Sequence, residues 1–316
     1  SGSLTHTADL QVNTYTTLAA GPALLSPEDG AIDVPPNVEF SWQALPGAIS
    51  YHLQVATDQA FGNIILDEDG LTTINFLPAS ALQTDTRYYW RVIAENVCNA
   101  TNENEVFTFR TQPGPGDCPA GTTPRIIYLS DFEQGAAGWQ DTSSDLFHWS
   151  LSTVQAHSPM TAWLSSVPAQ ISDQRLVSPS FSLPEEETPL SLSFWHRWTF
   201  DSASVCNDGG VLEISTNNGV TWSPVPANVL LTTPYTGVIR SGVFNPLARR
   251  QAWCGVTDWS WTVVDLAAYA GQNVIFRFRM GSGDAGGAEG WYVDDVRVQS
   301  CIQPAPQQLF LPLLMK

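Results

Sequence analysis

Apolar and polar residues alternate in short runs along most of this chain. Residues 38–42, 51–55 and 88–94 each carry an apolar side chain at every second position. A period of two is the pattern of a β-strand that buries one face. Turn-forming segments such as residues 45–47 (Leu-Pro-Gly) separate the runs, and no helical periodicity extends over three turns. The pattern therefore predicts an all-β chain built from short strands.

The distribution of proline and glycine divides the chain into two parts. With 316 residues, the chain is long enough for two hydrophobic cores. Residues 112–117 (Gln-Pro-Gly-Pro-Gly-Asp) have the composition of a linker. We therefore expect a smaller β domain at 21–113 and a larger one at 114–303. Residues 304–316 form a C-terminal tail, either a sorting signal or a segment packed on its own domain.

Residues 1–20 are a separate case. Apolar and polar residues alternate over positions 3–19, as in a strand, and a break at residues 19–22 (Ala-Ala-Gly-Pro) follows. A single strand is not stable in water. This leading strand must therefore join a sheet of its own molecule, of an upstream domain or of a neighbouring chain.

The smaller domain carries a spaced set of aromatic residues. Trp42 lies on the second predicted strand and Tyr51 on the third, and residues 82–96 contain the series Leu…Tyr-x-Trp-x-Val-x-Ala-x-Asn. These residues resemble a fibronectin type III domain over the whole of 21–113. The resemblance implies a β-sandwich that acts as a spacer or binding scaffold and carries no chemistry.

The larger domain contains several longer motifs. They include residues 131–139 (Asp-Phe-Glu…Gly-Trp), 192–195 (Leu-Ser-Phe-Trp), 208–215 (Asp-Gly-Gly…Ser) and 290–296 (Gly-Trp-Tyr-Val-Asp-Asp-Val). These segments resemble MAM domains and the jelly-roll modules of immune-inhibitor-A-type metallopeptidases. Such modules follow the catalytic domain in secreted bacterial proteases. The resemblance implies a jelly-roll sandwich with a calcium-associated, non-catalytic accessory role.

Two adjacent carboxylates, Asp294 and Asp295, interrupt the last predicted strand at its centre. An unpaired buried charge is strongly unfavourable, and a hard cation with oxygen ligands is a common remedy. Residues 131–133 (Asp-Phe-Glu) lie at the other end of the same domain. The acids would meet if the first and last strands of the domain lay side by side.

By the resemblance to MAM-like jelly rolls, calcium is expected to bind Asp131, Glu133, Ser158 and Asp295. Asp294 alternates to the other face and is expected to meet solvent or an arginine. In the alternative interpretation no metal is bound, and the carboxylates pair instead with Arg175, Arg277 or Arg297.

None of the five cysteines has the close spacing of a zinc site. Two disulfides formed in an oxidising compartment explain the cysteines better than a zinc site does. Cys118 and Cys301 bracket the larger domain, and Cys206 and Cys254 lie in predicted loops within it. We expect Cys118–Cys301 and Cys206–Cys254, with Cys98 outside both, although five cysteines allow other pairings.

The net charge of −18 excludes most polyanionic partners, because Lys and Arg together number only 13. Such a surface repels nucleic acid and anionic membranes. No apolar run approaches the roughly 20 residues that span a bilayer. The sequence indicates a protein that is secreted or held at the cell surface.

No catalytic motif is present, neither His-Glu-x-x-His nor Gly-x-Ser-x-Gly. His196 lies in a strand whose alternate residues are buried, which predicts a hydrogen-bonded structural imidazole. We predict no enzymatic activity. Trp253, Trp259 and Trp261 are candidates for ligand binding, because indole rings on jelly-roll faces can stack on sugars, while the alternative places them in the core.

We therefore expect a non-catalytic accessory, binding or adhesive region of a secreted bacterial protein, stabilised by calcium. Its partner would be a protein or glycan at the cell surface. One alternative is a structural subunit of an extracellular polymer, in which copies of the chain are joined by donation of the leading strand. The other alternative is a carbohydrate-binding module.

Overall fold

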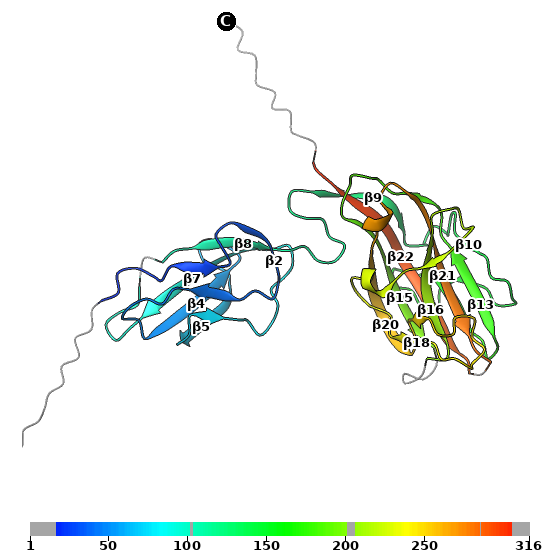
Figure 1. Cartoon of the computed structure of the whole chain (residues 1–316), viewed down its shortest axis with the longest axis horizontal. Coiled ribbons are helices and arrows are strands. Elements are labelled where there is room, and N and C mark those ends of the chain that lie inside the picture. The colour runs from blue at the N-terminus through cyan, green and yellow to red at the C-terminus, as the bar shows by residue number, and fades with distance from the viewer. Residues whose placement is uncertain (1–16, 102–103, 201–205, 285, 305–316) are drawn as a thin grey trace, which may run out of the picture. The chain divides into compact units, whose positions relative to one another are not determined.

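The chain folds into two compact units, Ser1–Gly114 and Pro115–Lys316, here called the smaller and the larger unit (Figure 1). The computed structural model describes residues 17–101, 104–200, 206–284 and 286–304. Apart from two three-residue 3₁₀ helices, the regular elements in these ranges are strands. The all-β sandwich fold predicted from the alternation is confirmed.

The smaller unit contains two sheets, with strand orders β1-β3-β6 and β2-β8-β7-β4-β5. Neighbouring strands are antiparallel except β2 and β8, which run parallel. Its strands are β1 (Leu24–Ser26), β2 (Ala31–Val34), β3 (Phe40–Trp42), β4 (Ser50–Ala56), β5 (Ile64–Leu71), β6 (Asn75–Phe76), β7 (Arg87–Glu95) and β8 (Phe107–Thr111).

Alternation decides which face of each strand the smaller unit buries. On β4, Tyr51, Leu53 and Val55 enter the core. Trp90 of β7 meets Phe40 of the other sheet edge to face, with ring centroids 5.2 Å apart. The intervening polar residues of β4, β5 and β7 therefore lie together on the outer face of the five-stranded sheet.

Most of the expected leading strand at 1–20 lies outside the described residues. Its last part is attached to the smaller unit. Leu18 is buried in the core of this unit, and its backbone N–H and C=O both bond to the Asn99 side chain, at 2.9 and 2.8 Å. Donation of this strand to another molecule stays a prediction.

The larger unit contains two main sheets. The first has the order β11-β12-β22-β15-β20, with β9 also paired to β22, and the second has the order β10-β13-β21-β16-β17, with β14 also paired to β21. The strands of the first sheet are β9 (Thr123–Ser130), β11 (Ser150–Ser152), β12 (Ala162–Val167), β15 (Leu190–Thr199), β20 (Val256–Asp265) and β22 (Ala288–Ile302).

The remaining elements build the second sheet and the segments that cover it. They are β10 (Gln140–Asp141), β13 (Ser172–Val177), β14 (Phe181–Ser182), β16 (Gly209–Ser215), β17 (Ser223–Pro224), η1 (Ala227–Val229), β18 (Gly237–Val238), β19 (Gln251–Ala252), η2 (Ala267–Tyr269) and β21 (Asn273–Ser282).

The two main sheets pack face to face through aromatic residues. Phe278 of β21 meets Phe194 of β15 and Trp291 of β22, with centroid distances of 5.0 and 5.8 Å. All three side chains are fully buried. Apolar burial of this extent is the main contribution to the stability of the unit.

The first and last strands of the larger unit are neighbours, as expected. β9 pairs antiparallel with β22, in a register that runs from Ser130↔Val296 to Thr123↔Ile302. The Cys118–Cys301 disulfide ties the same ends together. A second disulfide joins Cys206 and Cys254, so both pairings match those expected from the sequence. Cys98 takes part in neither.

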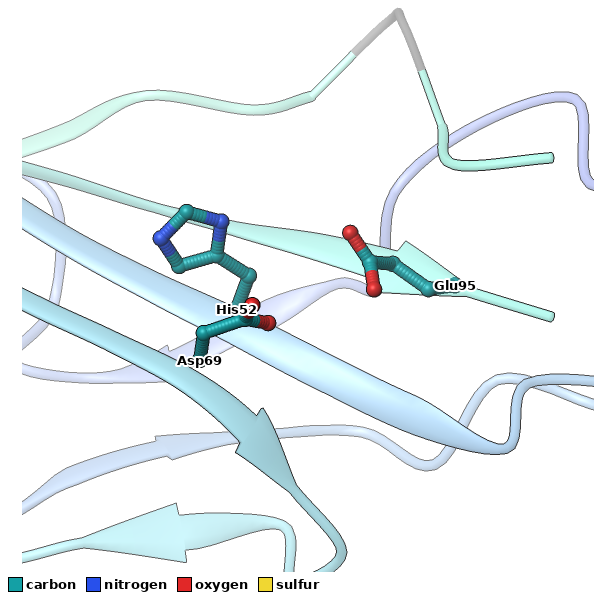
Figure 2. A group of neighbouring side chains, drawn as sticks. All are labelled: His52, Asp69 and Glu95. Carbon is teal, nitrogen blue, oxygen red and sulfur yellow. The ribbon is translucent and has the colours of Figure 1, made fainter.

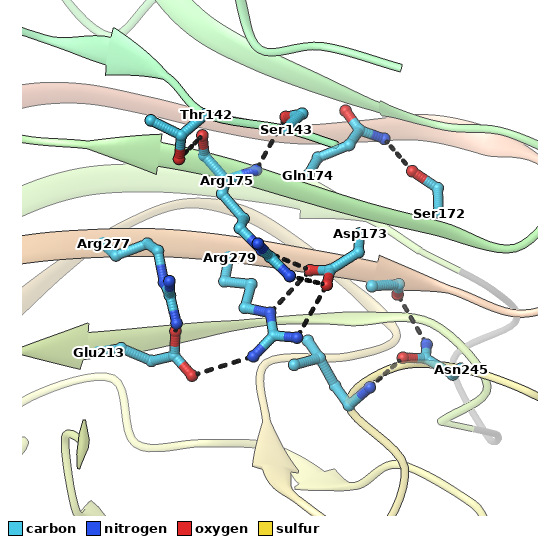
Figure 3. Close-up of polar contacts among 12 residues, drawn as sticks. Thr142, Ser143, Ser172, Asp173, Gln174, Arg175, Glu213, Asn245, Arg277 and Arg279 are labelled. Atoms are coloured by element: carbon cyan, nitrogen blue, oxygen red, sulfur yellow. Dashed lines mark hydrogen bonds and ion pairs between the residues drawn. The ribbon is translucent and has the colours of Figure 1, made fainter. Parts of the chain in front are cut away.

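A network of ion pairs covers the outer face of the β13-β21-β16 sheet (Figure 3). Asp173 forms ion pairs with Arg175 and Arg279. Glu213 forms ion pairs with Arg277, at 2.5 Å, and with Arg250. Burial alone would raise the pKa of Glu213, but the arginines hold it below its ordinary value.

This network bears on the alternative that arginines replace calcium. Arg175 and Arg277 were candidate partners for the acids of the expected calcium site. They pair instead with Asp173 and Glu213 on the second sheet.

Candidate functional site

The outer face of the first sheet of the larger unit carries three half-buried tryptophans. On β15, alternation buries Phe194, His196 and Trp198 and turns Trp195 to the opposite face. Trp195 lies directly opposite Trp261 of β20. Direct partners on antiparallel strands project to the same side, so the two indoles stand together outside the core.

A histidine from the β11–β12 loop completes this surface. The His157 ring stacks on Trp195, with centroids 3.9 Å apart and an interplanar angle of 10°. It also meets Trp259 edge to face at 5.7 Å. We call Trp195, Trp259, Trp261 and His157 the aromatic face.

Charged groups border the aromatic face. Arg197 lies 3.4 Å from Glu289 and 3.9 Å from Asp258, and its guanidinium lies over the Tyr292 ring at 5.8 Å. Burial, together with the neighbouring Glu289, raises the pKa of Tyr292. The border therefore offers hydrogen-bond donors and acceptors beside the flat rings.

The sequence pointed to only part of this surface. Trp259 and Trp261 were expected to bind a ligand, and both are half-buried on the outer face. Trp195 and His157 were missed. The sequence could have indicated Trp195, since it lies two residues from the polar Arg197 on the same strand and therefore on the same, outward face.

Trp253 was also expected to bind a ligand, and its position contradicts this. It is fully buried, and its indole N–H donates to the Thr233 carbonyl at 3.0 Å. Its ring packs against Phe194 and Trp291. Trp253 is therefore a core residue, because it lies in a segment that bridges to Gly210 rather than on an outer sheet face.

His196 is a structural imidazole, as predicted. Its Nδ1 accepts the indole N–H of Trp291 at 3.2 Å, which leaves Nε2 to donate to the Thr262 hydroxyl at 2.8 Å. Complete burial lowers the pKa of His196 to about 3. The ring is therefore neutral at physiological pH and serves the core.

The acids of the expected calcium site gather around the β11–β12 loop. Asp295 accepts the Ser158 hydroxyl and the His157 imidazole, both at 2.5 Å. Glu133, just beyond β9, accepts the backbone N–H groups of Met160 and Thr161 at 3.0 and 2.6 Å. The first strand, the loop and the last strand thus place oxygen atoms in one region.

Asp294 belongs to the same region, contrary to expectation. It is fully buried and accepts the backbone N–H groups of His157 and Ser158 at 2.9 and 3.1 Å. Asp295 has a φ of +49°, and the pairing of β22 with β15 shifts register here. This β-bulge cancels the alternation, so both acids face the loop.

The electrostatics of this region favour a cation. Burial raises the pKa of Asp294 to about 6, and the neighbouring Asp295 carboxylate adds to the rise, so a second negative charge is unfavourable at this point. Asp131 lies nearby in sequence and accepts the Glu133 N–H at 3.1 Å. Carboxylate and hydroxyl oxygens are the ligands that calcium prefers, so this donor set fits the ion in chemistry.

The geometry sets one condition on calcium binding. Within the described residues, no three acids of this region have ligand atoms that all lie within 4.8 Å of one another. A calcium ion held by three of these carboxylates would therefore need at least one of them to move.

The comparisons with known proteins give distant similarities. No protein-family model matches the chain, and no curated protein matches it. The K1 cleaved adhesin domain of Lys-gingipain from Porphyromonas gingivalis W83 is 16% identical, with 56% of this chain and 97% of that chain covered and a TM-score of 0.34.

Two further solved structures show the same level of similarity. A carbohydrate-binding module of the β-sandwich superfamily is 14% identical over 88% of this chain and 98% of its own, with a TM-score of 0.35. An Fn3-like protein from Clostridium thermocellum is 24% identical over 29% of this chain and 94% of its own, with a TM-score of 0.23. Similarity at this level identifies neither a ligand nor an activity.

The described part of the chain holds no helix with the length and apolar character needed to cross a membrane.

Proposed function

We propose that this chain is a non-catalytic binding region of a secreted protein, and that its larger unit binds carbohydrate through the aromatic face. One observation carries the proposal: Trp195 and Trp261 stand side by side on an outer sheet face, half-buried rather than packed in the core. Aromatic side chains outside a core are typical of ligand and partner surfaces.

The surroundings of these rings favour a sugar as the ligand. Indole rings offer flat apolar surfaces on which the C–H faces of pyranose rings stack. The guanidinium of Arg197 and the carboxylates of Asp258 and Glu289 lie beside them and can bond to sugar hydroxyls. A site of this kind combines stacking with a few polar groups that fix orientation.

The secreted context is part of the same proposal. Two disulfides in the larger unit indicate folding in an oxidising compartment. The net charge of −18 favours solubility outside the cell and attracts divalent cations.

Calcium at Asp131, Glu133, Ser158 and Asp295 is the proposed stabiliser of the larger unit. The ion would supply positive charge between the end of β9 and the bulge of β22. The buried Asp294 supports this proposal, because Asp294 and Asp295 both bond to His157 and Ser158, and a cation beside the two carboxylates would offset their charges. The ion would have no part in ligand chemistry.

Glycan binding can be tested on the full chain with a polysaccharide and glycan array, followed by calorimetry on the tightest ligand. We expect Trp259→Ala and Trp261→Ala each to weaken binding about tenfold or more, since one stacking contact contributes about 1.4 kcal/mol. Trp222→Ala is the matched control, because Trp222 is a half-buried tryptophan beneath Arg277 of the second sheet.

Two outcomes would overturn the carbohydrate proposal. One is the absence of binding to every glycan on a broad array. The other is glycan binding that both variants of the aromatic face leave intact. Thermal melts of each variant would show whether a loss of binding reflects the site or a failure to fold.

A further inference from the structure

A cluster of metal-ligating side chains lies on the smaller unit, whereas the aromatic face and the acids of the expected calcium site belong to the larger unit. His52 projects from β4, Asp69 from β5 and Glu95 from β7, all from the outer face of the five-stranded sheet. One ligand atom from each residue lies within 4.8 Å of the other two. Figure 2 shows the three side chains turned toward one another.

The imidazole of this cluster is held in a fixed orientation. His52 Nε2 lies 2.5 Å from Oδ1 of Asp67, the next outward residue along β5. With Nε2–H donated to a carboxylate, the lone pair of the neutral ring is on Nδ1, the nitrogen turned toward Glu95 in Figure 2. A carboxylate on the far nitrogen is the usual arrangement behind a metal-bound histidine.

Asp67 is itself anchored by a chain of contacts. Its Oδ1 accepts Gln54 Nε2 at 3.0 Å. Gln54 is buried, and its carbonyl accepts two guanidinium N–H groups of Arg91, at 2.9 and 2.7 Å. Arg91 lies over the Phe61 ring at 4.0 Å.

This anchoring fixes the position of Asp67. Its carboxylate is held by Gln54 on one side and by His52 on the other. Asp67 is thus in place before any ligand binds, and His52 is oriented in advance.

The other two acids of the cluster, Asp69 and Glu95, pair with no arginine among the residues that the structure describes, although other acids of the chain do. Asp69 accepts a local N–H, that of Gly70 at 2.7 Å. Two carboxylates beside an imidazole make a site that a divalent cation would neutralise.

We propose that His52, Asp69 and Glu95 form a binding site for a first-row divalent transition metal, with zinc as the probe, and that Asp67 orients His52 behind it. A nitrogen ligand favours this class of metal, since calcium and magnesium take oxygen ligands. Three protein ligands leave one position of a tetrahedral zinc open to water or to a donor from another molecule.

The test is calorimetric titration of the untagged full chain with zinc chloride after removal of metals with a chelator. We expect one zinc ion bound by the wild type through this site. His52→Ala should abolish that binding, and Asp67→Asn should weaken it by about 10- to 100-fold, as for other residues that support a metal ligand.

His148→Ala is the matched control. His148 also pairs with an aspartate, Asp141 at 2.6 Å, but belongs to no cluster of three metal-ligating groups among the described residues. The His148→Ala variant should bind zinc as the wild type does. Zinc binding that is unchanged in His52→Ala, or lost equally in His148→Ala, would overturn the proposal. Circular dichroism and thermal melts of the metal-free variants establish that each one is folded.

Discussion

Asp294 and Asp295 are sequence neighbours in one strand, yet both carboxylates reach the same loop. Asp294 binds the backbone N–H groups of His157 and Ser158, and Asp295 binds the side chains of the same two residues. The left-handed φ of +49° at Asp295 makes this possible. Two negative charges thus lie together at the closure of the larger unit.

The first prediction concerns Asp294 and pH. Its pKa is raised from 3.8 in the unfolded chain to about 6 in the folded one, so the folded state holds the proton more tightly. The stability that this provides is fully present below about pH 4 and is lost as pH rises through about 6. Thermal melts of Asp294→Asn and of the wild type should therefore be compared across this range. The variant cannot lose a proton here, so its stability relative to the wild type should increase between about pH 4 and pH 7.

Asp258→Asn is the control for this series, because its side chain is 92% exposed. Its difference from the wild type should be small, because an exposed carboxylate contributes little to stability. A stability difference for Asp294→Asn that does not change between about pH 4 and pH 7 would contradict the raised pKa of Asp294.

The second prediction concerns the ion network of the second sheet. Glu213→Gln leaves Arg250 and Arg277 without their buried carboxylate. Removing one partner of such a pair destabilises a protein by about 3–5 kcal/mol. Urea denaturation of the larger unit should show this loss, and the exposed Asp258→Asn should change stability by less than about 1 kcal/mol. A loss below about 1 kcal/mol for Glu213→Gln would show that the network contributes little.

The third prediction concerns calcium. After dialysis against a chelator, added calcium should raise the melting temperature of the larger unit. At one hundred times its dissociation constant the ion would stabilise the unit by about 2.7 kcal/mol. Glu133→Gln and Asp295→Asn should each weaken this response, since each removes a charged oxygen ligand. Identical melts with and without calcium would refute calcium binding at these residues.

Much of the fold could be predicted from alternation alone. The inward set Phe194, His196 and Trp198 and the outward Trp195 on β15 follow directly from a period of two. The neighbouring first and last strands could be expected as well. Alternation fails where the backbone departs from it, as at Asp295. Its left-handed φ carries only a weak sequence signal, because aspartate adopts it more readily than most residues.

The functional surfaces were harder to predict, for a related reason. Trp253 lies outside the regular strands, so the alternation of inward and outward residues could not show which way its side chain points. His52, Asp69 and Glu95 come from three strands that are neighbours only through the order of the sheet. No local pattern gives that order, and none shows that β5 shifts register beside His52.

The disulfide Cys118–Cys301 has a mechanical consequence. It joins the residue at which the chain enters the larger unit to one at which it leaves, across a sequence separation of 183. Tension applied along the polypeptide from either side therefore passes through the disulfide bond. The residues between the two cysteines carry none of this force. The aromatic face would therefore keep its shape while the protein is pulled.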